Sequence, residues 1–329
     1  NVEDRYGNAI KADSKKNFQA ELFLYEEIIL QDEPIAYFRF EETSGSVAKN
    51  SGTGGDPKDG LYMVDIDEGT AKNEAGPRPG DFLGFAPDNL AAVFDGQADW
   101  VDTQNQYLQN LAAFSLEYWV KPVDRDTWPT RVGIVGQNDA IEYGFIDSTT
   151  IQIWTPGGGA LNTTYPMDQG FEDGTWHHVA TIATGEGIVN YFDGVFQNEI
   201  TSSTADYGGS TFNVNIGGGG VFDSIDANGN WFTGQIDEVA IFDKAIPAER
   251  IEAHFLAGKF AIDPDATPDD PPVFDPITLS GGQVTISWTG TGILEESDDV
   301  AGPYTESANQ NNPQTVTPVG NKYYRLRQP

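Results

Sequence analysis

The segment GTWHHVATI, residues 174–182, holds two of the chain's three histidines side by side. Adjacent imidazoles raise two chemical possibilities, a metal site and an acid–base pair. The segment has the alternation of a strand, and neighbouring side chains of a strand point to opposite faces of the sheet. His177 and His178 therefore cannot converge on one ion, and no further histidine or cysteine lies near them in the sequence. We predict that both have a structural role, hydrogen-bonded beside Trp176.

Acidic side chains are the second source of chemistry. The chain carries 51 acidic and 18 basic residues, a net charge of −33, which repels phosphate backbones and attracts divalent cations. We therefore expect no nucleic acid partner. The stretch DSIDANGN places Asp226, Asn228 and Asn230 at alternate positions, and these oxygen donors suit calcium. An ordinary Asx-turn loop is the competing interpretation, because no Glu completes an EF-hand and no helices flank the stretch.

Motifs for covalent and phosphate chemistry are missing from the sequence. It contains no cysteine and no G-x-S-x-G elbow, and its run GGGGVF lacks the Lys-Ser/Thr that holds a nucleotide. In QIDEV, strand alternation places Asp237 and Glu238 on opposite faces, so these two neighbouring acids are not expected to act together. We therefore expect a protein without catalytic activity.

Short strands joined by tight turns must position these side chains. From Ile35 to about Asp243, apolar runs alternate and are interrupted by Gly, Asp and Asn. Asp193-Gly194 lies between two such runs and is the strongest short hairpin signal in the chain. The pattern predicts an all-β fold in which two antiparallel sheets form a sandwich.

Two segments have helical spacing instead. Residues 17–31 have apolar side chains on one helical face: Phe18, Leu22, Tyr25 and Ile29. We expect this leading helix to stop before Pro34 and to pack on the main domain, and a docking arm for a neighbouring subunit is the alternative. Pro247 opens a second short helix, and Gly258 is its expected end.

Composition divides the chain into four parts. Residues 1–16 form a polar, locally basic N-terminal arm that cannot bury enough surface to fold alone. Residues 17–260 form the main domain, and residues 261–273 form an acidic, Pro-rich linker. Residues 274–329 are expected to form a small second β-sandwich with Trp288 in its core.

Five ordered motifs add a family resemblance: PIAYFRFEETSG, FSLEYWVKP, GTWHHVATI, YFDGV and FTGQIDEVAIFDKAIPAERIEAHFLAG. In order and spacing they resemble the laminin-G-like, concanavalin A-like lectin/glucanase superfamily. The resemblance covers roughly residues 20 to 258 and implies a concanavalin A-like jelly roll of two antiparallel sheets. The tail ending in YYRLRQP resembles, more weakly, small fibronectin-like modules of secreted bacterial proteins. Fold does not set function, since this superfamily includes lectins, glycanases, adhesion modules and structural proteins.

The resemblance also implies site residues. Members of the superfamily often hold a structural calcium between early and late strands, which makes Glu42 of FEETSG and Asp237 of QIDEV candidate ligands. Asp95 and Asp99 of FDGQADWVD are weaker options.

Glycanases of this fold carry E-x-D-x-x-E or E-x-D-x-E on one strand, and this sequence has neither run. Lectin-type sites on the fold use loop aromatics, so Trp128 and Trp231 are the glycan-binding candidates. For each of them, a lid over a core edge is the alternative role.

Three functions remain open from the sequence. We expect first a secreted, non-catalytic and calcium-stabilised surface protein that acts in adhesion or self-assembles, with the N-terminal arm docking on the next copy of a homo-polymer. The alternative is a glycan-binding module of a polysaccharide-degrading system, and a diverged glycanase is weaker. No stretch is apolar and long enough to span a bilayer, and the start at Asn1 suggests processing, so we expect an extracellular or cell-surface location.

Overall fold

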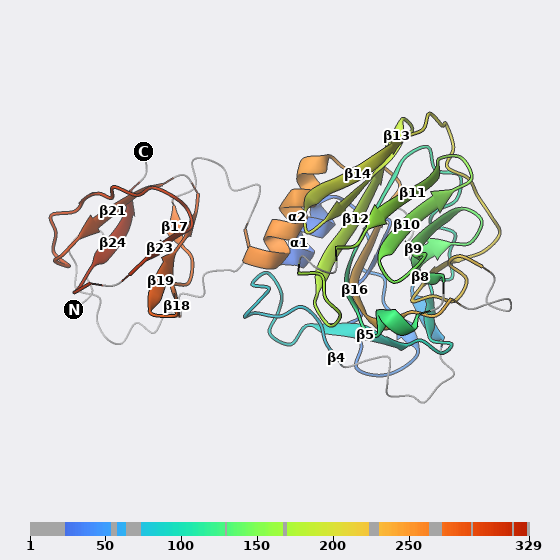
Figure 1. Cartoon of the computed structure of the whole chain (residues 1–329), viewed down its shortest axis with the longest axis horizontal. Helices are drawn as coiled ribbons and strands as arrows, with labels where there is room; N and C mark the ends of the chain where they lie inside the picture. Colours follow the sequence, from blue (N-terminus) through green and yellow to red (C-terminus); the bar gives the residue numbers. More distant parts are fainter. Residues whose placement is uncertain are drawn as a thin grey trace.

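The computed structural model describes residues 24–53, 58–63, 74–128, 130–166, 170–223, 230–262, 272–290, 292–317 and 319–327. Within these ranges, two antiparallel sheets form the predicted jelly-roll sandwich (Figure 1). The strand order of the first sheet is β14-β13-β12-β7-β16-β5-β4, with β1 paired to β16, and that of the second sheet is β11-β10-β9-β8-β15-β6-β3-β2.

The first sheet comprises β1 (Ala36–Phe38), β4 (Glu74–Ala75), β5 (Leu90–Asp95), β7 (Phe114–Pro122), β12 (His177–Ala183), β13 (Gly187–Phe192), β14 (Val195–Thr201) and β16 (Thr233–Phe242). The second sheet comprises β2 (Val47–Ala48), β3 (Gly60–Met63), β6 (Trp100–Asp102), β8 (Val132–Gln137), β9 (Ile141–Phe145), β10 (Thr150–Thr155), β11 (Gly159–Thr164) and β15 (Val214–Ile216).

Both faces of the central strand β7 are buried. Phe114, Leu116, Tyr118 and Val120 point into the core between the two sheets, as the alternation predicts. Trp119 points the other way, into a second apolar cluster beneath the helices. Since removal of apolar surface from water is the main driving force of folding, this two-sided burial makes β7 the centre of the domain.

Two helices cover the outer face of the first sheet, α1 (Tyr25–Gln31) and α2 (Ala248–Phe260) (Figure 1). The expected face of α1 is confirmed at Tyr25 and Ile29, which are both buried against the domain. The expected end of α2 at Gly258 is wrong, because the helix continues to Phe260. A Cβ atom on Gly258 would lie 2.8 Å from Cζ2 of Trp119, so this glycine permits close helix-to-sheet packing.

A hairpin turn and a β-bulge in the first sheet orient polar side chains. At the predicted hairpin, Asp193 and Gly194 both have positive φ, of 48° and 73°, which is the geometry of a two-residue hairpin between β13 and β14. In β16 the pairing with β7 shifts register between Asp237 and Ala240, and Glu238 has a φ of 53°.

This bulge corrects the expected orientation of two acids. Because one extra residue is inserted, Glu238 does not point into the inter-sheet core and instead receives a hydrogen bond from Tyr37, which belongs to the cluster beneath the helices. Asp237 lies on the same outer side, because it pairs with Trp119 across the strands and the Trp119 side chain belongs to the cluster beneath the helices. The prediction of opposite faces for Asp237 and Glu238 is therefore wrong.

Three small sheets make up the C-terminal region. Its strands are β17 (Val273–Phe274), β18 (Thr278–Ser280), β19 (Gln283–Ile286), β20 (Trp288–Thr289), β21 (Ile293–Ser297), β22 (Thr305–Glu306), β23 (Gln314–Val316) and β24 (Tyr323–Arg327). Ile286, Trp288 and Leu294 form its buried centre, so the expected core role of Trp288 is confirmed.

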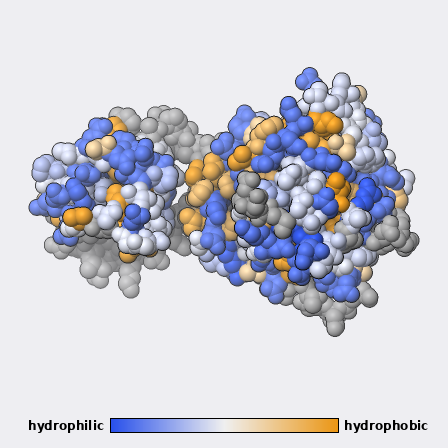
Figure 2. Space-filling view, in the orientation of Figure 1, coloured by the Kyte–Doolittle hydropathy of each residue, from blue (hydrophilic) through white to orange (hydrophobic). Residues whose placement is uncertain are grey.

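The surface agrees with the acidic composition. On the face shown in Figure 2, hydrophilic and intermediate residues cover most of the molecule and apolar residues form small scattered patches. Neither of the described helices has the length and apolar character needed to traverse a bilayer.

Candidate functional site

A cavity of about 490 Å³ brings together the two tryptophans that the sequence nominated for glycan binding. It lies between the end of β5, the 3₁₀ turn η1 (Arg125–Thr127), the residues around Asp223 and the start of β16. Trp128 and Trp231 both line it, although they are about a hundred residues apart in the sequence. Four polar side chains line the same cavity: Asp95, Arg131, Asp223 and Asn230.

Trp128 combines the two roles that the sequence left open. Its ring packs edge-on against Phe145, with centroids 5.0 Å apart, and against Phe232 at 5.6 Å, so it closes one edge of the core. The side chain is nonetheless only half-buried and contributes to the cavity wall. Its Nε1 is buried and has no hydrogen-bond partner among the described residues.

The turn that presents Trp128 is held by Arg125, which sequence reasoning missed. Arg125 is fully buried, its backbone N–H and its Nε both donate to Asp173, and its Nη2 donates to the carbonyl of Phe171. Its guanidinium also stacks over Tyr165, 4.9 Å from the ring centroid. A buried, fixed guanidinium of this kind is an anchor, because moving it leaves an unpaired charge in the interior.

Trp231 forms the other aromatic wall. Its ring lies 5.5 Å from that of Trp100, with the planes tilted by 34°. Gly219 permits this position, since a Cβ atom there would lie 2.4 Å from Cζ3 of Trp231. The rings of Trp128, just after η1, and Trp231, just before β16, therefore both border the cavity.

The polar groups supply both donors and acceptors. Asn230 donates from Nδ2 to Asp223 at 2.9 Å, and Oδ1 of Asp95 accepts the backbone N–H of Gln97 at 2.7 Å. Arg131 lies over the ring of Phe222, and its Nη1 is 3.7 Å from Oδ2 of Asp223. That separation is too long for a hydrogen bond, so the guanidinium keeps donors for a ligand. Aromatic walls with a few convergent polar groups are typical of sites for small polar ligands.

The calcium predictions have separate outcomes. Asp226 and Asn228 lie outside the described residues, and Asn230 lines the cavity. Glu42 accepts from the hydroxyl of Tyr62 at 2.7 Å and from the backbone N–H of Lys49 at 2.8 Å. Among the residues that the structure describes, no group of three His, Cys, Asp or Glu side chains is arranged to hold a metal. The structure does not pair Glu42 directly with Asp237.

Asp237 nevertheless has surroundings that fit a cation. It is fully buried, accepts from Nδ2 of Asn89 at 2.8 Å, and has a pKa raised well above its usual range by burial and by the charge of Glu238. Oδ1 of Asn89 is buried without a partner in the described part of the chain. Gly76 faces these groups, and a Cβ there would lie 2.7 Å from Oδ2 of Asp237. Oδ1 of Asp237 also accepts the backbone N–H of Glu238, so Asp237 and Oδ1 of Asn89 would supply two of the six to eight oxygens that calcium takes.

The paired histidines confirm the prediction of opposite faces. On one side of β12, Nδ1 of His177 lies 2.8 Å from Asp193 and its ring stacks on Phe171. On the other side, Nε2 of His178 donates to Glu117 at 3.0 Å in the cluster beneath the helices. His177 thus connects β12 to the hairpin residue Asp193, and His178 connects β12 to Glu117 on β7.

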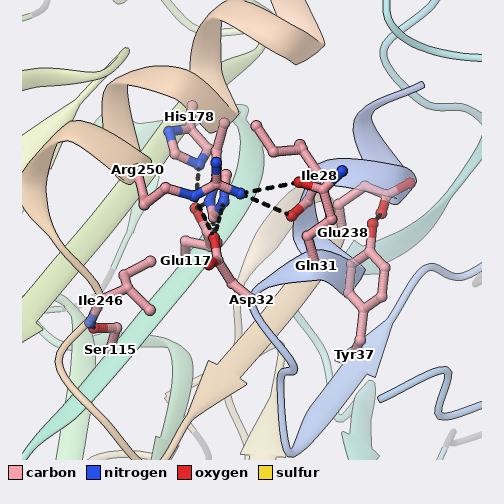
Figure 3. Close-up of polar contacts among 11 residues, drawn as sticks. Ile28, Gln31, Asp32, Tyr37, Ser115, Glu117, His178, Glu238, Ile246 and Arg250 are labelled. Carbon is pink, nitrogen blue, oxygen red and sulfur yellow. Dashed lines mark hydrogen bonds and ion pairs between the residues drawn. The ribbon is translucent and has the colours of Figure 1, made fainter. Parts of the chain in front are cut away.

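A chain of charges beneath the helices, buried at Glu117 and His254, is a second feature that sequence reasoning missed (Figure 3). Nδ1 of His254 lies 2.9 Å from Glu117, and its Nε2 lies 2.8 Å from Asp32. Because both ring nitrogens face carboxylates, His254 is an imidazolium that donates to each of them. Arg250 donates to Asp32 as well, at 2.8 Å. The four charges balance, and they fasten α1 and α2 to β7.

The pKa values follow from this arrangement. Burial by itself favours neutral forms, raising the pKa of Glu117 and lowering that of His254. The opposite charges prevail, so the pKa of Glu117 is about 2 and the pKa of His254 is about 9. Since the group lies under two helices and away from the tryptophan-lined cavity, we assign it a structural role.

Comparison with known proteins identifies the domain. Residues 95–252 match the family model described as the concanavalin A-like lectin/glucanases superfamily. The match and the two antiparallel sheets show that this segment has the concanavalin A-like jelly-roll fold. It contains the central strand β7, the described residues that line the cavity, and the paired histidines. A search of the curated proteins found no match.

Three solved structures illustrate what the chain is similar to. Domain 4 of the extracellular arabinanase AbnA from Geobacillus stearothermophilus, in complex with arabinotriose, is 16% identical over 68% of this chain and 98% of that chain, with a TM-score of 0.46. The heptameric SAP-like pentraxin of Limulus polyphemus is 14% identical over 49% and 78%, with a TM-score of 0.39. The binding domain of botulinum neurotoxin serotype D is 11% identical over 90% and 72%, with a TM-score of 0.46.

Proposed function

We propose that the protein is an extracellular, non-catalytic glycan-binding protein that holds its ligand in the cavity between Trp128 and Trp231. The observation that carries this proposal is the convergence of two tryptophans with Asp95, Arg131 and Asp223 on one cavity of about 490 Å³. Sugars present apolar C–H faces and a ring of hydroxyl groups. Tryptophan rings match the first feature, and a mixture of donors and acceptors matches the second.

The test is a glycan array followed by calorimetry on the best ligand. Trp231→Ala and Trp128→Ala should each weaken binding by about tenfold or more, because buried aromatic anchors carry much of the energy of such sites. Trp154→Ala is the matched control, since this half-buried tryptophan on β10 does not line the cavity. Melting temperatures show whether each variant is folded. Unchanged affinity in folded Trp231→Ala, or no glycan bound by the wild type, would contradict the proposal.

The side chains of the cavity support glycan binding without cleavage of the glycan. Asp95 and Asp223, the two acids among the described residues that line the cavity, each accept an N–H hydrogen bond, and the sequence lacks the E-x-D-x-x-E and E-x-D-x-E runs expected of a glycanase of this fold. One observation favours a diverged glycanase as a second candidate: burial raises the pKa of Glu142 to about 7, and the charges of Arg131 and Asp223 act on it. Glu142 does not line the cavity. Release of reducing sugar that disappears in Glu142→Gln would establish the enzyme.

Calcium binding and self-assembly are two further properties expected from the sequence. We propose that a structural calcium is held by Asp237 with the side-chain oxygen of Asn89, for the reasons given above. Polymer formation through residues 1–16 stays a prediction, since these residues lie outside the described part of the chain. Electron microscopy of the purified protein tests it directly, and a monodisperse monomer at high concentration would contradict it.

A further inference from the structure

The charge of the cavity indicates which class of glycan it takes. Asp95 and Asp223 are two carboxylates on the cavity wall, and among the described residues Arg131 is the one basic residue that lines it. Arg131 is already compensated, because its guanidinium lies beside Asp223 and over the ring of Phe222. The described residues of the lining therefore have a net charge of about −1, within a chain of net charge −33. A negatively charged sugar entering here meets repulsion both locally and from the whole surface.

Hydrogen-bonding capacity leads to the same conclusion. Carboxylates only accept hydrogen bonds, whereas a sugar hydroxyl both donates and accepts. The carboxylates of Asp95 and Asp223 match hydroxyl groups, and Arg131 donates to the oxygens of neighbouring hydroxyls. A sulfate or uronate oxygen placed against either aspartate finds no proton to share, and its desolvation is not recovered. Arg131 alone cannot serve as an anion clamp while Asp223 stands beside it.

We propose that the cavity is specific for uncharged glycans and excludes sulfated and uronate sugars, with Asp95 and Asp223 as the specificity-determining residues. This inference rests on the glycan-binding function proposed above. Arg131 then recognises hydroxyl groups of the sugar, and the site discriminates between ligands by their charge.

The experiment compares ligands that differ only in charge. A sulfated galactan is compared with its desulfated form, and oligogalacturonate is compared with its methyl ester, together with an array of neutral oligosaccharides. At low salt we expect the best uncharged ligand to bind at least about tenfold more tightly than any charged one, and within each matched pair that binds, the uncharged form to bind more tightly. Added salt should narrow the gap, because screening weakens repulsion between exposed charges.

Two variants separate repulsion from shape. Asp95→Asn and Asp223→Asn keep the size of the side chain and remove its charge, so the charged forms should gain affinity relative to the uncharged ones. Asp243→Asn, an exposed acid outside the cavity lining, should leave the ratio unchanged. Equal or tighter binding of a sulfated or uronate probe to the wild type would overturn the specificity while leaving glycan binding intact. Absence of binding by every probe would overturn both proposals.

Discussion

Nδ1 of His254 on helix α2 lies 2.9 Å from the carboxylate of Glu117 on strand β7, and neither side chain is exposed to solvent. The same carboxylate accepts from His178, and the far side of the His254 ring reaches Asp32 just beyond α1. One buried anion thus joins two strands and two helices. The apolar cluster beneath the helices borders this group, since the rings of Tyr25 and Trp119 lie 6.4 Å and 5.4 Å from the ring of His178.

Removal of the Glu117 charge should destabilise the domain strongly. Glu117→Gln leaves the His254 imidazolium buried with only Asp32 as a counter-ion, and breaking a buried ion pair in this way costs about 3–5 kcal/mol. Urea denaturation measures the change in the free energy of unfolding. Glu199→Gln on the exposed edge strand β14 is the control and should change it by less than about 0.5 kcal/mol. A cost below about 1 kcal/mol for Glu117→Gln would show that the charges contribute little.

Stability should fall in alkaline solution because of His254. Its pKa of about 9 in the folded protein lies above the value of about 6.5 expected in the unfolded chain. The folded state therefore binds this proton more tightly, so the stabilisation is complete below about pH 6.5 and is lost as the pH rises through about 9. Urea denaturation between pH 6 and 10 should show this decline in the wild type. The decline should be smaller in His254→Gln, and curves of equal slope would refute the assignment.

Calcium removal tests the site at Asp237. If calcium is bound there, excess EDTA should lower the melting temperature by roughly 5 °C or more, since a ligand that binds only the folded state stabilises it by mass action. Asp237→Asn should melt at the same temperature with and without EDTA. Asp243→Asn, at an exposed position, should keep the full EDTA response. An unchanged wild-type midpoint in EDTA would reject the calcium proposal without affecting glycan binding.

Arg125 should influence glycan binding although it does not line the cavity. Its buried contacts with Asp173 and Phe171 hold the turn before Trp128, so Arg125→Gln should misplace that ring and weaken binding by about tenfold. Binding of the same glycan by calorimetry measures the loss, with circular dichroism as a check on folding. Arg325→Gln, a half-exposed arginine of the C-terminal region, should bind like the wild type. Full affinity in a folded Arg125→Gln variant would mean that Trp128 needs no such support.

The sequence by itself determined the local architecture. Alternation in FSLEYWVKP predicted which side chains of β7 enter the core, and Asp193-Gly194 predicted the hairpin, because both signals depend on residues within one strand or turn. The same locality placed His177 and His178 on opposite faces. The ordered motifs then indicated the superfamily, and the loop setting of Trp128 and Trp231 indicated the binding candidates.

Only the tertiary structure decided which distant groups meet. Glu117 lies 61 residues from His178 and 137 from His254, and His254 lies 222 from Asp32, so no spacing rule links them. The cavity likewise depends on how the turn before Trp128 and the start of β16 pack together. Strand alternation also failed at Glu238, where one inserted residue turns the side chain to the other face. Such contacts arise from packing and register between segments far apart in the chain, and a local pattern carries no record of either.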